Sequence, residues 1–225
     1  GFARLVDEAR GGDSATTAIP RRKTTGPGPL SPMQLRLWFM EEMNPGTAIY
    51  NLPACFRFHG HLDVEALRHA LNTITARHSN LRSTFGWVNG ELRQTIADEL
   101  RFDLTPRTLL GLSPAERESQ LLSELHALAA LPFDLQRGPL VRAELYVLGP
   151  EESVLFFMPH HAVWDGWSFD VFLNELDQLY AARVRGETPR LPQLEVDYGD
   201  FVEWYNQGPS AFCGPRDRVG LATVT

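Results

Sequence analysis

The sequence predicts an α/β sandwich, a two-layer fold with a mixed and largely antiparallel sheet. Three observations lead to this fold class. Apolar residues at helical spacing alternate along the chain with short apolar runs that are typical of strands. Asn89-Gly90 lies between two such runs, and this dipeptide is the strongest short signal for a hairpin. Gly149-Pro150 opens a turn between two more. Because hairpins join antiparallel strands, a doubly wound parallel sheet is disfavoured.

Most of the expected helices begin at a recognisable N-terminal cap. Ser31, with Gln34 three residues later, predicts a capping box, and Ser113 opens the same pattern again. Asp63 and Ser168 are expected to cap two further helices. The expected helices cover residues 33–43, 64–78, 114–131, 169–185 and 197–205.

Strands are expected where apolar and aromatic residues run together. Pro53 interrupts or bulges the first of them. The expected strands cover residues 49–52, 55–58, 81–87, 92–96, 102–104, 140–148 and 153–158. On two of the helices, the residues expected to face the core are Leu37, Trp38, Phe39, Phe169, Phe172, Leu173, Leu176 and Tyr180.

The composition excludes several classes of function. A formal net charge of -7 disfavours a nucleic-acid partner, because phosphate binding requires a basic face. No apolar run approaches the length needed to span a bilayer, so no membrane partner is expected. Cys55 and Cys213 are too few for a disulfide scaffold, which favours a reducing compartment and hence a cytoplasmic location.

The composition also divides the chain into four segments. Residues 1–10 have the pattern of the last helical turns of a preceding domain. Residues 11–29 are rich in Gly, Ser, Thr and Pro and predict a solvated linker. Residues 30–207 contain all of the elements predicted above. Residues 208–225 show no core periodicity and form an atypical tail.

The chemically distinctive stretch is the sequence HHAVWDG at residues 160–166. It follows the apolar run 154–157, a predicted buried strand, and precedes a predicted helix. Titratable groups at such a junction are held by rigid elements and still lie near the surface, where a reacting group is needed. A purely structural role, in which the histidines and Asp165 satisfy one another at the strand end, is one interpretation.

Three chemical interpretations compete with the structural one. A metal site is disfavoured because adjacent strand residues point to opposite faces and no nearby cysteine supplies another ligand. A hydrolase triad is disfavoured because Ser168 lies in no Gly-x-Ser-x-Gly turn. General-base acyl transfer fits better, since a histidine can take a proton from an attacking amine or hydroxyl near neutral pH and return it. Gly166 would then let a substrate approach the backbone closely.

Residues 160–166 resemble the His-His-x-x-x-Asp-Gly motif of the condensation domains of nonribosomal peptide synthetases. Three further stretches are similar to other motifs of this family and follow in the same order: LSPMQLRLWFM at residues 30–40, RHSNLRSTF at 77–85 and YGDFVEW at 198–204. PFDL at 132–135 and GPLVR at 138–142 are also family-like. The resemblance implies a chloramphenicol acetyltransferase-like sandwich, of which this chain carries the first lobe.

The resemblance also implies an activity and residue roles. The amine of a downstream aminoacyl group would attack an upstream acyl or peptidyl thioester, and an amide bond would form. His161 matches the residue that acts as base or positions the amine, and His160 matches a structural residue. Asp165 is expected to form a buried ion pair with Arg82 or Arg77. Losing the partner of a buried aspartate would cost several kcal/mol.

The resemblance implies no directly bound cofactor and no metal. Substrates would instead arrive on the phosphopantetheine arms of an upstream and a downstream carrier domain, with an adenylation domain adjacent. Residues 1–10 are similar to the end of such a carrier domain. An epimerisation domain or an ester-forming relative shares the histidine motif and stays open as an alternative. A cyclising domain is disfavoured, because it would carry aspartates in place of the histidines.

The family-like motifs stop at about residue 205, whereas the family continues into a second lobe of comparable length. We therefore expect an incomplete chain, and a truncation or frameshift after residue 207 is a reasonable hypothesis. The active-site tunnel of the family lies between the two lobes. The isolated chain is accordingly expected to have little or no condensation activity. The alternative function is an inactive lobe that only docks carrier proteins.

Overall fold

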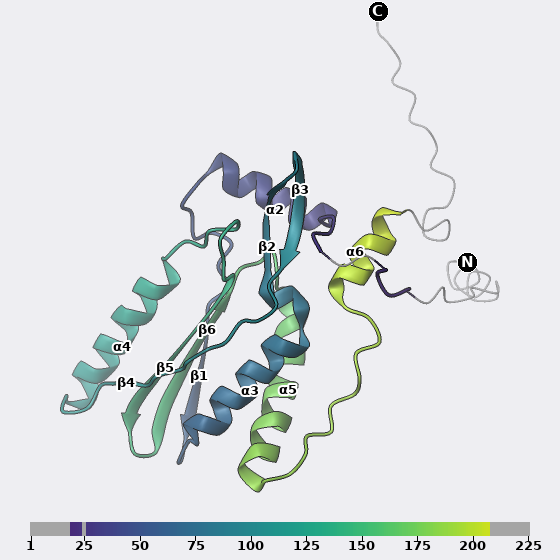
Figure 1. Ribbon diagram of the computed structural model, residues 1–225. Helices are drawn as coiled ribbons and strands as arrows, with labels where there is room; N and C mark the ends of the chain where they lie inside the picture. The colour runs from purple at the N-terminus through teal and green to yellow at the C-terminus, as the bar shows by residue number, and fades with distance from the viewer. Residues whose placement is uncertain (1–18, 24–25, 208–225) are drawn as a thin grey trace, which may run out of the picture.

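A four-stranded mixed sheet forms the centre of the computed structural model, which describes residues 19–23 and 26–207. The sheet order is β1-β6-β5-β4 (Figure 1). The strands are β1 (Ala54–His59), β4 (Arg107–Thr108), β5 (Val141–Gly149) and β6 (Glu152–Pro159). β6 pairs antiparallel with β1 and β5, whereas β4 pairs in parallel with β5. The predicted α/β fold with a mixed, largely antiparallel sheet is confirmed.

Helices cover both faces of this sheet. α3 (Val64–Arg77) and α5 (Gly166–Arg185) lie side by side on one face (Figure 1). Phe56 of β1 packs against Phe172 of α5, with ring centroids 6.1 Å apart. The next residue, Arg57, pairs instead with Glu118 of α4 (Pro114–Ala129) at 2.8 Å. Because neighbouring strand residues point to opposite faces, α4 covers the face opposite α5. All residues of the central strand from 153 to 159 are therefore buried.

A separate hairpin lies beside one end of α3. It consists of β2 (Ser83–Val88) and β3 (Glu91–Ile96), and the short 3-10 helix η1 (Ser79–Arg82) leads into it. Asn89 and Gly90 have φ angles of 52° and 82°, as a two-residue hairpin turn requires. The predicted hairpin is thus confirmed.

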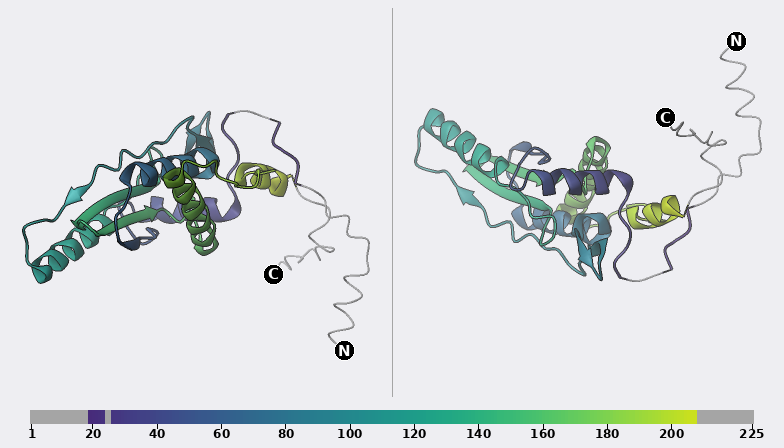
Figure 2. Two further views of the ribbon diagram at one scale, coloured as in Figure 1. Left: turned by 90° about the horizontal axis from the view of Figure 1, so that it is seen from below. Right: turned by 90° about the horizontal axis from the view of Figure 1, so that it is seen from above.

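Several predicted caps are also confirmed. The side chains of Ser31 and Ser113 accept hydrogen bonds from the third residue of α2 (Pro32–Met43) and of α4, in full capping boxes. Asp63 caps α3. The last helix, α6 (Tyr198–Asn206), begins after Asp197 and lies to one side of the sheet (Figure 2).

Four local predictions are wrong. The N-cap of α5 is Asp165, and Ser168 is the third helical residue. Residues 49–52 form no strand, and Asn51 makes only an isolated bridge to His160. Residues 102–104 form no strand either, because Leu104 has a left-handed φ of 53°, so that the edge strand is the two-residue β4. Two residues expected in the core are exposed on the outer sides of their helices: Phe39 at 54% and Leu173 at 42%.

The described part of residues 11–29, which the sequence predicts to be a linker, bonds to the folded lobe at several points. The Arg21 guanidinium donates to the carbonyl oxygens of Leu194 and Glu195, both at 2.8 Å. The Arg22 N–H donates to Asp200 of α6 at 2.7 Å. Gly28 exchanges two backbone hydrogen bonds with Gln94 of β3, at 2.8 and 2.9 Å. The expectations for residues 1–10 and 208–225 lie outside the described residues.

Candidate active site at the histidine loop

Residues 160–165 form a tight loop between the end of β6 and the start of α5. The Val163 N–H donates to the His160 carbonyl at 3.0 Å and closes the turn. The two histidine backbones are held from opposite sides: His160 N–H donates to Leu140 at 2.8 Å, and His161 N–H donates to Tyr50 at 2.9 Å. The loop therefore has a fixed path, and its two histidines point in different directions.

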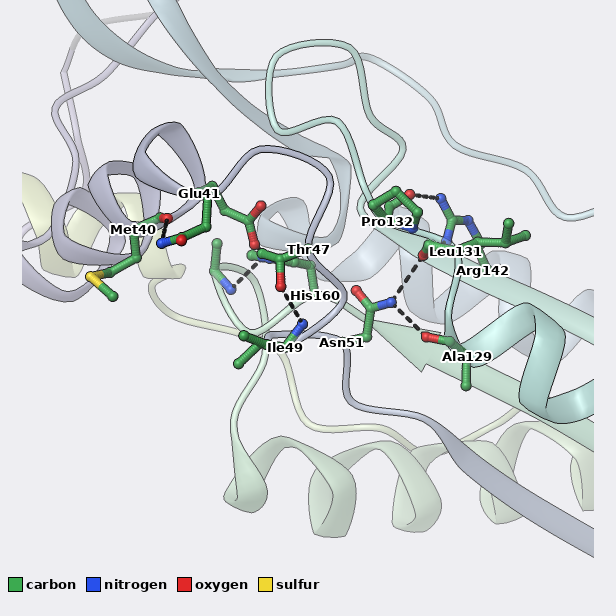
Figure 3. A network of polar contacts seen from close by, with 12 residues as sticks. Met40, Glu41, Thr47, Ile49, Asn51, Ala129, Leu131, Pro132, Arg142 and His160 are labelled. Atoms are coloured by element: carbon green, nitrogen blue, oxygen red, sulfur yellow. Dashed lines mark hydrogen bonds and ion pairs between the residues drawn. The ribbon is translucent and has the colours of Figure 1, made fainter.

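His160 is a buried histidine with both ring nitrogens engaged. Its side chain is 1% exposed, and its Nδ1 accepts a hydrogen bond from the Ala162 N–H at 3.1 Å. The proton must then be on Nε2, which lies 3.3 Å from a carboxylate oxygen of Glu41 in α2 (Figure 3). Burial, and secondly the charge of His161, lower the pKa of His160 to about 4, while burial raises the pKa of Glu41. The contact at neutral pH is a hydrogen bond from a neutral imidazole.

The family-like connection at residues 132–142 supports His160. The Arg142 guanidinium lies 3.9 Å from the centre of the Phe133 ring and donates to the Leu131 and Pro132 carbonyls at 2.7 and 2.6 Å (Figure 3). Phe133 in turn packs edge-on against the His160 ring, with centroids 5.9 Å apart. Arg142 therefore holds the residues that follow α4 and the aromatic side chain that packs on His160.

His161 is exposed, and its ring is held by a single hydrogen bond. Its Nδ1 lies 2.7 Å from the carbonyl oxygen of Trp164. A carbonyl oxygen only accepts hydrogen bonds, so Nδ1 carries a proton, and in the neutral form of the ring Nε2 has the lone pair. Within the described residues, His161 Nε2 makes no hydrogen bond. This nitrogen is free to accept a proton from a bound group.

Side chains hold three successive carbonyl groups of the loop. The Gln34 amide of α2 donates to Ala162 at 3.4 Å, and the Asn80 amide of η1 donates to Val163 at 2.9 Å. The His161 ring donates to the third carbonyl, that of Trp164. The conformation that presents His161 is therefore set by side-chain donors from two other elements.

Asp165 and Gly166 begin α5. One carboxylate oxygen of Asp165 accepts from the Ser168 N–H at 2.9 Å and from the Ser168 hydroxyl at 2.6 Å. A carboxylate at this end of a helix is also stabilised by the helix dipole. A Cβ added to Gly166 would meet no atom within 4 Å, so the space in front of this backbone is open. This leaves room for the close approach that the sequence predicts at Gly166.

The predicted ion pair of Asp165 with Arg82 or Arg77 does not form. Arg77 pairs with Glu175 of α5 at 3.0 Å, and Arg82 donates to the carbonyl oxygens of Ala97 and of residues 75 and 76 at the end of α3. Asp165 is exposed and already satisfied as a helix cap, so it needs no cationic partner. The buried carboxylate of this region is Glu175.

A cavity of about 300 Å³ adjoins the loop between α3, α5 and α6. Its lining includes Asn80, Trp164, Asp165, Trp167 and Tyr198. His161 is not a lining residue, so the cavity lies beside the loop and not around the His161 ring. In the part of the chain that the structure describes, no three His, Cys, Asp or Glu side chains are grouped to hold a metal ion. Nor is any helix in those residues long and apolar enough to cross a membrane.

A family model described as Condensation domain matches residues 25–211. The match covers most of the chain. The chain belongs to the condensation domain family. One of the linear gramicidin synthase proteins of Brevibacillus parabrevis is 43% identical over 176 residues, which are 78% of this chain and 2% of that protein. Phosphinothricin tripeptide synthetase PhsC of Streptomyces viridochromogenes is 40% identical over 188 residues, which are 83% of this chain and 17% of that protein.

Solved structures show the same fold in longer chains. The X-domain from teicoplanin biosynthesis superposes with a TM-score of 0.74 at 31% identity, over 84% of this chain and 40% of that chain. The starter condensation domain of rhizomide synthetase RzmA superposes with a TM-score of 0.72 at 21% identity, over 82% and 44%. This condensation domain chain thus spans less than half of the solved chains it matches, and it has the fold of one lobe.

Sequence reasoning missed three residues at or near this candidate site: Glu41, Asn80 and Glu175. Asn80 lies within the predicted second motif, but nothing in its position shows that its amide reaches the histidine loop. One signal was present in β3, where the buried Gln94 shares a strand face with Leu92 and Ile96. A polar side chain at an inward strand position needs buried hydrogen-bond partners, and Asn80 is one of the partners of Gln94.

Proposed function

We propose that this chain supplies the histidine-bearing lobe of a domain that joins two carrier-bound acyl groups through an amide bond. The observation that carries the proposal is the 2.7 Å contact between His161 Nδ1 and the Trp164 carbonyl. It fixes the ring in the form whose Nε2 is basic and exposed. An accessible histidine in a fixed tautomer is what proton abstraction from an amine requires.

In the proposed reaction, the amine nitrogen of the acceptor attacks the carbonyl carbon of the donor thioester. His161 Nε2 takes the proton that the nitrogen loses as the new N–C bond forms. The C–S bond then breaks, and the departing thiolate receives this proton from the His161 imidazolium. One amide and one thiol are formed, and His161 returns to its neutral form. A positioned base of this kind contributes about 10²–10⁴-fold to the rate.

We propose carrier-bound thioesters as the substrates. The two acyl groups would arrive on the phosphopantetheine arms of an upstream and a downstream carrier domain, beside an adenylation domain and in the cytoplasm. Two features support this assignment: the named relatives are a linear gramicidin synthase and a tripeptide synthetase, and the open space at Gly166 leaves room for an extended arm. We propose no directly bound cofactor.

The test replaces His161 in a two-lobed condensation domain that contains this lobe. His161→Ala and His161→Gln should lower the rate of amide formation between loaded carrier domains by about 10²–10⁴-fold. Circular dichroism should show unchanged folding. His126→Ala, on the exposed side of α4, is the matched control and should leave the rate unaltered. Undiminished turnover in both His161 variants would exclude the base role.

A second candidate function is protein docking without catalysis. One solved relative, the X-domain from teicoplanin biosynthesis at 32% identity, is found in a complex with OxyB. If this function is correct, His161→Ala should not change the binding of a partner protein. Neither the unmodified domain nor the His161→Ala variant should form an amide. Binding can be measured by sizing chromatography of the mixture, and turnover separates the two candidates.

A further inference from the structure

Asn80 connects the second family-like motif to the histidine loop. The sequence RHSNLRS at residues 77–83 runs through η1, and its two arginines, Arg77 and Arg82, bond to groups other than Asp165. The Asn80 amide nitrogen instead lies 2.9 Å from the Val163 carbonyl oxygen in the middle of the loop. The direct side-chain contact from this motif to the loop is therefore an amide–carbonyl hydrogen bond.

Gln94 determines which way the Asn80 amide points. The Gln94 Nε2 donates to the Asn80 oxygen at 3.2 Å and to the Ser83 hydroxyl at 2.6 Å. With its oxygen facing this donor, Asn80 must turn its own N–H groups toward Val163. Gln94 is 3% exposed, and its backbone is bonded to Gly28 on the other side. The orientation of Asn80 is thus fixed from a buried, doubly anchored residue.

The bond from Asn80 acts one peptide unit away from the group that orients His161. Val163 and Trp164 share a peptide bond, and the Trp164 carbonyl accepts the His161 Nδ1 proton. If the Val163 carbonyl loses its donor, this peptide plane can rotate, and the direction of the following carbonyl changes with it. The hydrogen bond that selects the His161 tautomer depends on that direction.

We propose that Asn80, oriented by Gln94, is a positioning residue for His161. Its role is to hold the loop so that Nδ1 of His161 is protonated and Nε2 is the free base. The consequence of this positioning for catalysis rests on the proposed base function of His161. It assigns the contact between the second motif and the histidine loop to an asparagine, and not to the predicted arginine–aspartate pair.

The test is the tautomeric state of His161 in the 225-residue chain, measured by ¹⁵N NMR of the imidazole nitrogens near neutral pH. The spectrum of His161→Gln identifies the His161 signals. In the unmodified chain, we expect the two ¹⁵N shifts of a neutral ring protonated on Nδ1. In Asn80→Ala, both shifts should move toward each other, as the two tautomers become mixed. Gln94→Ala should produce a smaller change in the same direction and no further change in the Asn80→Ala background.

Asn72→Ala is the matched control. Asn72 is also half-buried and makes one donor and one acceptor bond to the backbone of Phe102, at 3.1 and 2.7 Å, away from the loop. Its replacement should lower stability and leave the His161 shifts unaltered. If Asn80→Ala does not fold, Asn80→Asp keeps the side-chain volume and removes the donor. Unaltered His161 shifts in a folded Asn80 variant would overturn the proposal.

The readout needs no turnover, so it is separate from the test of the proposed function. If His161 proves dispensable for amide formation while Asn80→Ala shifts its tautomer, the base function fails and the positioning contact stands. If His161 is essential and Asn80→Ala leaves its tautomer unaltered, the positioning role fails alone.

Discussion

His160 and His161 are neighbours whose surroundings give them opposite properties. His160 is enclosed by the Tyr50 and Phe133 rings, and both of its nitrogens are engaged, so its neutral form is strongly favoured. His161 is exposed and keeps one nitrogen free. The division of roles that the motif resemblance implies, with His160 as structural and His161 as chemical, stays a prediction, and the geometry supports it.

The burial of His160 predicts a loss of stability in acid. Its pKa is about 4 in the folded chain and 6.5 as the ordinary value, so the unfolded chain takes up its proton first as the pH falls. The stabilisation that comes from keeping His160 neutral is intact above pH 6.5. Between pH 6.5 and 4 it is lost, and the free energy of unfolding falls by about 3 kcal/mol in total. The raised pKa of Glu41 acts with the opposite sign and offsets part of this loss.

Urea unfolding at pH 7 and at pH 4.5 measures the effect. His160→Asn retains an acceptor for the Ala162 N–H and has no titrating group, so its stability should fall less over this interval. The comparison of the two proteins isolates His160 from other titrating groups. An equal fall in both proteins would show that the buried imidazole does not cause the acid sensitivity.

At the scale of elements, local chemistry was predictable and long-range partners were not. Caps depend on residues three apart, which is why Ser31 and Ser113 were placed correctly. Asp165 and Ser168 form the same reciprocal pair, and the sequence pattern did not show which of them begins α5. The contact of Asn80 with Val163 spans 83 residues and involves no charge or periodicity. The residues next to Asn80 and Val163 in the sequence therefore give no sign of this hydrogen bond.

The packing of α3 against α5 is expected to depend on Glu175. This carboxylate is buried and accepts from Arg77 at 3.0 Å and lies 2.7 Å from the His78 ring. Without Glu175, Arg77 would keep only its bond to the Pro192 carbonyl, and removing one partner of a buried ion pair costs about 3–5 kcal/mol. Glu175→Ala should therefore lower the free energy of unfolding by about that amount in urea titrations.

Two controls define this prediction. Glu187→Ala removes an exposed partner of Arg185 and should cost at most about 1 kcal/mol. Asp165→Ala removes a helix cap and should cost about 1 kcal/mol, and not the several kcal/mol expected of a buried ion pair. A larger loss for Asp165→Ala than for Glu175→Ala would contradict the assignment of the buried carboxylate.

At the scale of the whole molecule, α2 exposes several large apolar side chains to solvent. Leu37 and Trp38 are buried against the lobe, and the opposite surface is also largely apolar. The exposed apolar residues of α2 are Met33, Leu35, Phe39, Met40 and Met43, of which Met43 is 76% exposed. Large exposed apolar patches are normally covered by another part of a protein or by a partner. The solved relatives of this fold extend over more than twice the matched length.

We therefore expect the isolated 225-residue chain to self-associate through α2. Light scattering after sizing chromatography should show a mass that rises with concentration. The double variant Phe39→Glu and Met43→Glu should reduce this rise and keep the circular dichroism spectrum, because both side chains are exposed. Leu122→Glu changes an exposed residue of α4 and should leave the association as it is. A monomeric, protease-resistant chain at all concentrations would show that the apolar surface of α2 needs no cover.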